Sequence, residues 1–98
     1  MDCKIVWTEP AIEDLHSLVS HVARDFPEKA REIGYALIDH VNVLAQFPFL
    51  GPVYRCTERS DVRELLCGNN RIFYRVIETK KLVELLHVRH VARDEPVL

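Results

Sequence analysis

The stretch from Asp61 to Arg93 constrains the fold more than any other part of the chain. It holds three runs of aliphatic, aromatic and β-branched residues, separated by Gly68-Asn69-Asn70 and by Glu78-Thr79-Lys80-Lys81. Both separators are short and polar, and glycine and asparagine tolerate the positive φ that tight hairpins need. The pattern predicts a three-stranded antiparallel meander, with strands over residues 61–67, 71–77 and 82–90.

The alternation of side chains sorts this meander into two faces. Two-residue loops at Asn69-Asn70 and Thr79-Lys80 place Phe73 opposite both Leu66 and Leu86. One face is then nearly continuous apolar surface and is expected to pack on helices; it carries Leu65, Cys67, Ile72, Tyr74, Val76, Val83, Leu85 and His87, with Arg63 at one end. The other face mixes arginine, carboxylate, aromatic and imidazole groups, as an exposed working surface does; it carries Val62, Glu64, Leu66, Arg71, Phe73, Arg75, Glu84, Leu86, Val88 and His90.

The first half of the chain predicts one short strand and two helices. Residues 4–7 are apolar and suit a strand, and Thr8 and Pro10 are typical of a helix start. Apolar residues then recur at helical spacing over residues 9–25 and 27–46, with a break at Pro27. We therefore expect a single α+β domain over residues 1–98, in the order β-α-α-β-β-β, with an antiparallel sheet and a two-helix hairpin on one face.

Composition excludes several classes of protein. The chain has 98 residues and a net charge of −2, which is not typical of a general nucleic-acid-binding protein. Its three cysteines form no CxxC pair and no metal-ligand spacing with histidine, so we expect reduced thiols, no metal site and no cofactor. The chain shows no signal peptide and no apolar run of about 20 residues that could span a membrane. These features predict a cytoplasmic protein.

Four segments carry a resemblance to a known family. They are FPFLGP at 47–52, VRELL at 62–66, NNRIFYRV at 69–76 and LLHVRHVARDEP at 85–96. In this order and spacing they resemble the RelE/ParE superfamily of bacterial toxins, also known as plasmid stabilisation proteins. The family pattern has a Pro-x-x-Gly turn after the second helix, here Pro48 and Gly51. Its last strand closes on His-x-x-Arg-Asp, here His90, Arg93 and Asp94.

The resemblance implies the growth-inhibiting toxin of a bacterial type II toxin–antitoxin module, neutralised by a cognate antitoxin. Some relatives are ribosome-dependent, metal-independent mRNA endoribonucleases; others, the ParE branch, bind DNA gyrase. This chain has Val62 and Glu64 where the nucleases carry a lysine pair, and it ends on Val97-Leu98 without their terminal tyrosine. These departures favour the ParE branch, and they leave open whether the chain is an enzyme.

The candidate site residues lie on the meander and just after it. In a nuclease, Arg71 would hold a phosphate, His90 would act as acid or base, Arg93 would lie beside them and Phe73 would stack on a base. Arg75 faces Glu64 and Glu84 in the expected register, so a structural charge ladder is the alternative for it. Contacts to a target or to an antitoxin are expected from Arg63, Phe73, Arg75, Arg89, Arg93 and Asp94.

Overall fold

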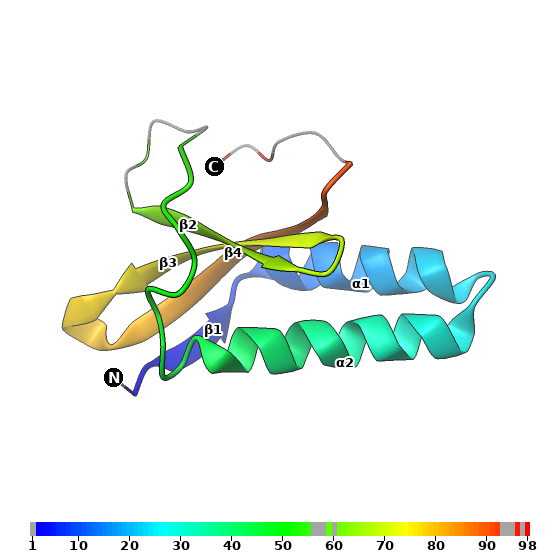
Figure 1. Cartoon of the computed structure of the whole chain (residues 1–98), viewed down its shortest axis with the longest axis horizontal. Coiled ribbons are helices and arrows are strands. Elements are labelled where there is room, and N and C mark those ends of the chain that lie inside the picture. Colours follow the sequence, from blue (N-terminus) through cyan, green and yellow to red (C-terminus); the bar gives the residue numbers. More distant parts are fainter. Residues whose placement is uncertain (1, 56–58, 60, 93–95, 97) are drawn as a thin grey trace.

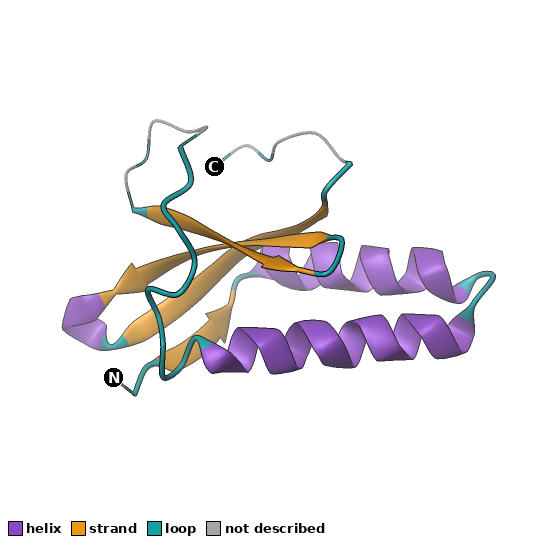
Figure 2. Cartoon of the chain, in the orientation of Figure 1, coloured by secondary structure: helices purple, strands orange, loops and turns teal. Residues whose placement is uncertain are grey.

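A computed structural model gives the arrangement of the chain and describes residues 2–55, 59, 61–92, 96 and 98. Four strands and two long helices follow one another in the predicted order (Figures 1 and 2). They are β1 (Lys4–Trp7), α1 (Glu9–Ala23), α2 (Pro27–Val43), β2 (Val62–Cys67), β3 (Asn70–Ile77) and β4 (Leu82–His90), with a single 3-10 turn at Glu78–Lys80. The predicted fold class is confirmed.

The strands form one sheet in the order β1-β4-β3-β2. The pairs β2–β3 and β3–β4 are antiparallel, as the meander requires, and β1 pairs with β4 in parallel. The sheet is therefore mixed rather than wholly antiparallel. A parallel pair needs a long connection, and here α1, α2, β2 and β3 lie between β1 and β4 in the sequence.

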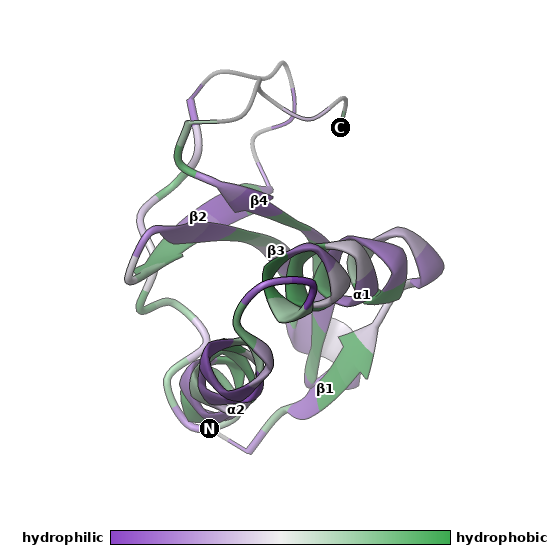
Figure 3. Cartoon of the chain, turned by 90° about the vertical axis from the view of Figure 1, so that its right-hand side faces the viewer, coloured by the Kyte–Doolittle hydropathy of each residue, from purple (hydrophilic) through white to green (hydrophobic). Residues whose placement is uncertain are grey.

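Thr8 marks the point where β1 ends and α1 begins. Its Oγ1 accepts a hydrogen bond from Ala11 N at 3.4 Å and donates one to Leu85 O at 2.6 Å. The threonine thus caps the helix and also binds the start of the helix to β4. Three residues, Arg24 to Phe26, then turn the chain into α2, where Pro27 occupies the first helical position. The two helices lie side by side under one face of the sheet and project beyond it (Figures 1 and 3).

The main core lies between this helical hairpin and the sheet. Its largest fully buried side chains include Tyr74, Ile72 and Leu85 from the central strands and Leu37 and Leu44 from the second half of the hairpin. The sheet residues belong to the face that the sequence predicts to pack on helices. That assignment is confirmed for the part of the meander before Leu86.

The β2–β3 hairpin turns one residue earlier than expected. Its loop is Gly68-Asn69, since Cys67 pairs with Asn70, and Leu66 therefore lies opposite Arg71 instead of Phe73. Gly68 has a φ of +60°, the positive value that the first loop position of a type II′ turn requires. A register error of two residues keeps every side chain on its own face, which is why the core face was still predicted correctly.

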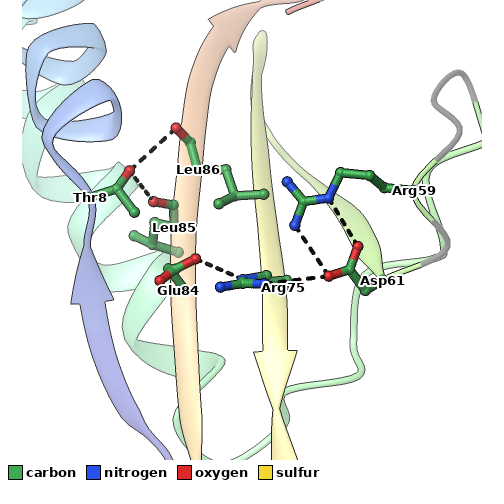
Figure 4. Close-up of polar contacts among 7 residues, drawn as sticks. All are labelled: Thr8, Arg59, Asp61, Arg75, Glu84, Leu85 and Leu86. Atoms are coloured by element: carbon green, nitrogen blue, oxygen red, sulfur yellow. Dashed lines mark hydrogen bonds and ion pairs between the residues drawn. The ribbon is translucent and has the colours of Figure 1, made fainter. Parts of the chain in front are cut away.

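A bulge at Leu86 reverses the faces in the last part of β4. Tyr74 pairs with Leu85 and Phe73 pairs with His87, so Leu86 is the extra residue. Thr8 Oγ1 contacts the carbonyl oxygens on both sides of this irregularity, at 2.6 Å for Leu85 and 3.4 Å for Leu86 (Figure 4). Val88, predicted on the open face, is instead buried in the helix-side core. The prediction for this end of β4 is wrong because a bulge shifts the alternation by one residue.

The opposite face of the sheet is covered in part. Tyr54, Val62 and Phe73 form a second buried cluster, and Tyr54 meets the Phe73 ring edge-on at 4.9 Å between centroids. Two backbone hydrogen bonds hold the segment around Tyr54 against β2. Tyr54 N donates to Val62 O at 2.8 Å, and Glu64 N donates to Pro52 O at 3.0 Å. Phe73 is fully buried. The expectation that its ring lies on an exposed surface is therefore wrong.

The turn before β2 is held to the sheet by its glycine. Gly51 N donates to the Tyr74 hydroxyl at 2.9 Å, and Gly51 O accepts from Arg63 Nη1 at 2.7 Å. A Cβ at Gly51 would lie 2.7 Å from Glu64 O and 2.9 Å from Tyr74 Oη, closer than van der Waals contact allows. Glycine is thus required here for close approach of the turn to β2 and β3.

We expect the Gly51→Ala substitution to lower the free energy of unfolding by about 1–3 kcal/mol, the cost of forcing extra atoms into a packed site. Gly34→Ala is the matched control, since its added Cβ would meet Val19 Cγ2 at an ordinary 3.5 Å. Alanine in a helix interior is favoured over glycine by about 0.5–1 kcal/mol. Urea unfolding of both variants measures the difference. Equal effects of the two substitutions would contradict the tight fit at Gly51.

Candidate functional site

Arg71, the residue expected to hold a phosphate, already has partners within the chain. Its Nε donates to Glu64 Oε2, and its guanidinium carbon lies 4.9 Å from the ring centroid of Phe73 and 5.9 Å from that of Tyr54. The side chain is 12% exposed. Arg71 is therefore paired with a carboxylate and stacked over the second buried cluster, which fixes its position on the sheet.

His90 does not share a face with Arg71. Arg71 pairs with Arg89 and Asn70 pairs with His90, so the two candidate residues alternate to opposite sides of the sheet. The bulge at Leu86 causes this difference from the expected register. His90 Nδ1 accepts a hydrogen bond from Ala92 N at 3.0 Å, which leaves Nε2 as the protonated nitrogen of the neutral ring. The remaining candidates, Arg93 and Asp94, lie outside the described residues.

Arg75 belongs to a row of charges across the sheet (Figure 4). Its Nε donates to Glu84 Oε1 at 2.7 Å, and its Nη1 lies 3.6 Å from Asp61 Oδ2, which Arg59 also contacts. The Glu84 carboxylate raises the pKa of Arg75, and the hydrogen bonds from Arg59 lower the pKa of Asp61. The predicted partner Glu84 is confirmed. The predicted partner Glu64 is wrong, because Glu64 pairs with Arg71.

Arg63 lies at the border between the sheet and the preceding turn. Besides its bond to Gly51, it lies over the Phe49 ring at 4.9 Å from the centroid. Next to it, burial raises the pKa of the Tyr74 hydroxyl, which accepts the Gly51 N–H bond. Because folding raises the pKa of Tyr74, its neutral hydroxyl contributes fully to the stability of the folded state below about pH 10. This contribution is lost as the pH rises through the pKa that Tyr74 has in the folded state. Both residues thus hold the turn in place.

An apolar groove runs between the two helices and was not predicted from the sequence. It has a volume of about 370 Å³ and is lined by Ile12, Leu15, His16, Val19, Ala30, Arg31, Gly34, Tyr35 and Ile38. Ile12 is 53% exposed, Tyr35 64% and Ile38 40%. Helical spacing assigns Ile12 to the buried stripe, but the apolar stripe of α1 is wider than the surface that the sheet covers. Apolar side chains in excess of what the core needs are the signal that could have indicated this groove.

A second cleft, lined by both polar and apolar side chains, lies between α1 and the end of β4. It has a volume of about 840 Å³, and its lining includes Ser17, Ser20, His21, Arg24, Arg89 and His90. Asp14 forms one side, where its Oδ2 lies 2.9 Å from His87 Nδ1, 3.1 Å from Val88 N and 3.8 Å from Arg89 Nε. This carboxylate fastens α1 to β4 beyond the end of β1. His87, which the alternation assigns to the face that packs on helices, bonds to Asp14 on this helix.

The described part of the chain offers no group of three or more histidine, cysteine or carboxylate side chains that could hold a metal ion. Cys3 and Cys67 are buried free thiols, and burial raises the pKa of Cys67. Cys56 lies outside the described residues. Among the described helices, none has the length and apolar character needed to cross a bilayer.

The fold resembles solved structures of toxin–antitoxin proteins. The structure resembles the ParDE toxin–antitoxin system of P. aeruginosa, with a TM-score of 0.75 and 25% identity over 91% of this chain and 96% of that chain. It also resembles the RelBE2 complex of Mycobacterium tuberculosis, with a TM-score of 0.72 and 23% identity over 92% and 99% of the two chains. The archaeal RelE–RelB complex of Pyrococcus horikoshii gives 0.62 and 16% over 96% and 100%.

The comparison with curated proteins finds no match. The sequence profile of the family described as "ParE toxin of type II toxin-antitoxin system, parDE" matches residues 5–95, which is nearly the whole chain. This match agrees with the resemblance carried by the turn at 47–52 and by the three strands of the meander. The chain therefore belongs to the ParE toxin family of type II toxin–antitoxin systems.

Proposed function

We propose that this toxin inhibits growth by binding a protein target, DNA gyrase, and that it does not cut mRNA. The observation that carries the proposal is the engagement of Arg71 by Glu64. Metal-free cleavage of RNA requires a base for the 2′-hydroxyl, cations for the phosphate and an acid for the leaving oxygen. A guanidinium already neutralised by a carboxylate is a poor cation for a phosphate.

The surroundings of Arg71 support the same choice. Val62 is fully buried in the second cluster, and Glu64 contributes a negative charge, so neither position adds the cations that the lysine pair of the nucleases supplies. His90 lies on the other side of the sheet from Arg71. The expected acid–base group and the expected phosphate-binding cation are thus separated by the sheet, which supports the proposal.

We also propose that a cognate antitoxin neutralises the chain by laying an amphipathic helix in the groove between α1 and α2. A helix presents apolar residues at intervals of three and four, which suits a long apolar groove. Ile12, Ile38 and Tyr35 provide exposed apolar surface there, and Arg31 and His16 border it. These bordering groups favour acidic residues beside the apolar stripe of the antitoxin helix.

Expression of the chain alone in a bacterium tests the proposed target. We expect growth arrest, inhibition of gyrase supercoiling by the purified chain, and intact mRNA in a ribosome assay run in parallel. Arg71→Ala and His90→Ala are expected to change supercoiling inhibition only in proportion to the contacts that they remove. Co-expression of a partner encoded by the adjacent gene should restore growth.

The nuclease alternative gives a different set of results. Ribosome-dependent mRNA cuts by the wild type, reduced by orders of magnitude in each of Arg71→Ala, His90→Ala and Arg93→Ala, would overturn the gyrase proposal, because groups acting on one phosphate fail together. Normal growth in the presence of well-expressed, folded protein would show that this chain is an inactive member of the family.

A further inference from the structure

We propose that the turn after α2 binds the protein target of this toxin, and that the target meets it with apolar side chains and a carboxylate. The turn patch consists of Arg63 of β2 and five apolar residues, Val43, Phe47, Phe49, Leu50 and Val53. The turn leaves α2 at the end opposite to the connection between the two helices (Figure 1). This inference rests on the proposed function, since only a toxin that binds a protein target needs such a surface.

The turn patch exposes more apolar surface than a loop usually does. Five of the eleven large hydrophobic residues that are exposed in the described part of the chain fall within residues 43–53. Phe47 is 60% exposed and Leu50 is 54% exposed. Residues 41–54 also contain no charged residue. Neighbouring exposed apolar side chains indicate a contact site for another protein, whereas scattered ones do not.

The backbone of the turn holds these side chains in a fixed arrangement. Pro48 and Gly51 are buried, and the hydrogen bonds already described hold Gly51 to the sheet. Phe47 N donates to Val43 O at 3.0 Å, and Leu50 N donates to Phe47 O at 3.1 Å. A surface that is ordered before binding loses little conformational entropy when a partner docks. The turn is therefore a preformed contact surface.

The charge of Arg63 indicates the chemistry of the partner. The other arginines in the strands each form an ion pair with a carboxylate of this chain; they are Arg71, Arg75 and Arg89. Arg63 forms no ion pair within the described part of the chain, and its Nη1 donates only to the carbonyl oxygens of Phe49 and Gly51. A planar guanidinium binds a carboxylate through two parallel hydrogen bonds. We therefore expect the target to place an aspartate or a glutamate beside Arg63.

Arg63 lies within the apolar part of the patch. Its guanidinium carbon is 4.9 Å from the centroid of the Phe49 ring, and its backbone forms an isolated bridge with Val53. Aromatic and arginine side chains are enriched in protein–protein interfaces, where the buried centre is apolar and the rim is polar. The turn patch has this composition.

The turn patch is separate from the groove proposed for the antitoxin. None of its residues lines that groove. Val43 follows Ile38 by five positions, which places it about 140° around α2 from this groove residue. A toxin of a toxin–antitoxin system has two partners to bind, an antitoxin and a target. Two separate apolar surfaces suit these two partners.

Serine substitutions in the full chain test the turn patch. Phe47→Ser and Leu50→Ser each remove an exposed apolar side chain, so both variants are expected to melt like the wild type. We expect each to raise the toxin concentration that half-inhibits supercoiling by purified gyrase about 30-fold, which corresponds to a loss of about 2 kcal/mol at an interface hot spot. Growth arrest on induction without antitoxin should be lost in the same variants.

The chain offers a matched control for each of these changes. Phe26 is 66% exposed at the start of α2, and Leu66 is 58% exposed on β2, both outside the turn patch. Phe26→Ser and Leu66→Ser therefore make the same chemical changes at similarly exposed positions. Both should inhibit supercoiling and arrest growth like the wild type.

Arg63→Gln tests the expected carboxylate of the target. It should weaken the inhibition of supercoiling and make the inhibition less sensitive to salt, because an ion pair is screened by salt. Arg63→Lys keeps the charge without the planar fork and should retain the salt sensitivity with reduced potency. Arg63 also holds Gly51, so the two serine variants keep the test valid if Arg63→Gln is destabilised.

Two results would overturn the proposal. The first is an equal effect of the turn variants and their controls on both supercoiling and growth. The second is loss of binding to the purified partner from the adjacent gene while growth arrest persists, which would assign the turn patch to the antitoxin. Failure of the proposed function gives a different result: the wild type arrests growth without inhibiting gyrase. The growth assay then still decides whether the turn patch binds the target.

Discussion

Replacing Leu85 with alanine is expected to lower the free energy of unfolding by about 2–5 kcal/mol, the range for truncation of a fully buried leucine. Leu85 has no exposed surface and lies in the main core between the sheet and the helices. Its carbonyl also accepts the Thr8 hydroxyl, which anchors the start of α1. Truncation therefore leaves a cavity directly beside the joint between β4 and the first helix.

Leu66→Ala provides the matched control within the same sheet. Leu66 is 58% exposed on the edge strand, so its truncation should change stability by less than about 0.5 kcal/mol. Chemical denaturation of the two variants compares the same chemical change at a buried and an exposed position. A loss below half a kilocalorie per mole for Leu85→Ala would mean that the assignment of the sheet faces is reversed.

The substitution Ile38→Asp is expected to abolish neutralisation by the antitoxin while growth inhibition persists. Ile38 lines the groove between the helices and is 40% exposed, so an aspartate there is solvated in the free toxin. An apolar helix seated in the groove would bury this carboxylate without a partner, which costs several kcal/mol. A loss of about 3 kcal/mol corresponds to roughly 100-fold weaker binding.

His40→Asp introduces the same carboxylate on α2, about 200° around the helix from Ile38. His40 is exposed and does not line the groove, so this variant should still be neutralised. Growth under co-expression, combined with the affinity of the purified pair, measures both variants. Full rescue of Ile38→Asp by the antitoxin would remove the groove from the proposed interface.

The fold could be predicted because its signals are local. The polar breaks at Gly68-Asn69 and Glu78–Lys81 delimit the meander, and Pro27 separates the helices. The β3–β4 register was predicted correctly from the pair Ile77–Leu82 to the pair Tyr74–Leu85. The four-residue connection gives the same pairing as the two-residue loop that was assumed. Signals of this kind depend on neighbouring residues, and sequence patterns report them well.

The candidate site was predicted less well because long-range contacts decide it. The bulge at Leu86 lies where Thr8 and Asp14 bind β4. Neither contact can be predicted from the sequence of the strand itself. The side chain of Phe73 looks exposed by alternation, but Tyr54 covers it from a segment that has no strand pattern. Arg71 could be placed on the correct strand, while its pairing with Glu64 depended on a register that was two residues in error.

The bond between Thr8 and Leu85 has a consequence for the order in which the protein folds during synthesis. These residues are 77 positions apart in the sequence, and the parallel pairing of β1 with β4 spans a similar distance. Contacts of such high sequence separation form slowly, because the intervening chain must first be closed into a loop. The groove between the helices lies within residues 12–38 and leaves the ribosome before the meander. A nascent chain therefore exposes the proposed antitoxin-binding segment before it can complete the sheet.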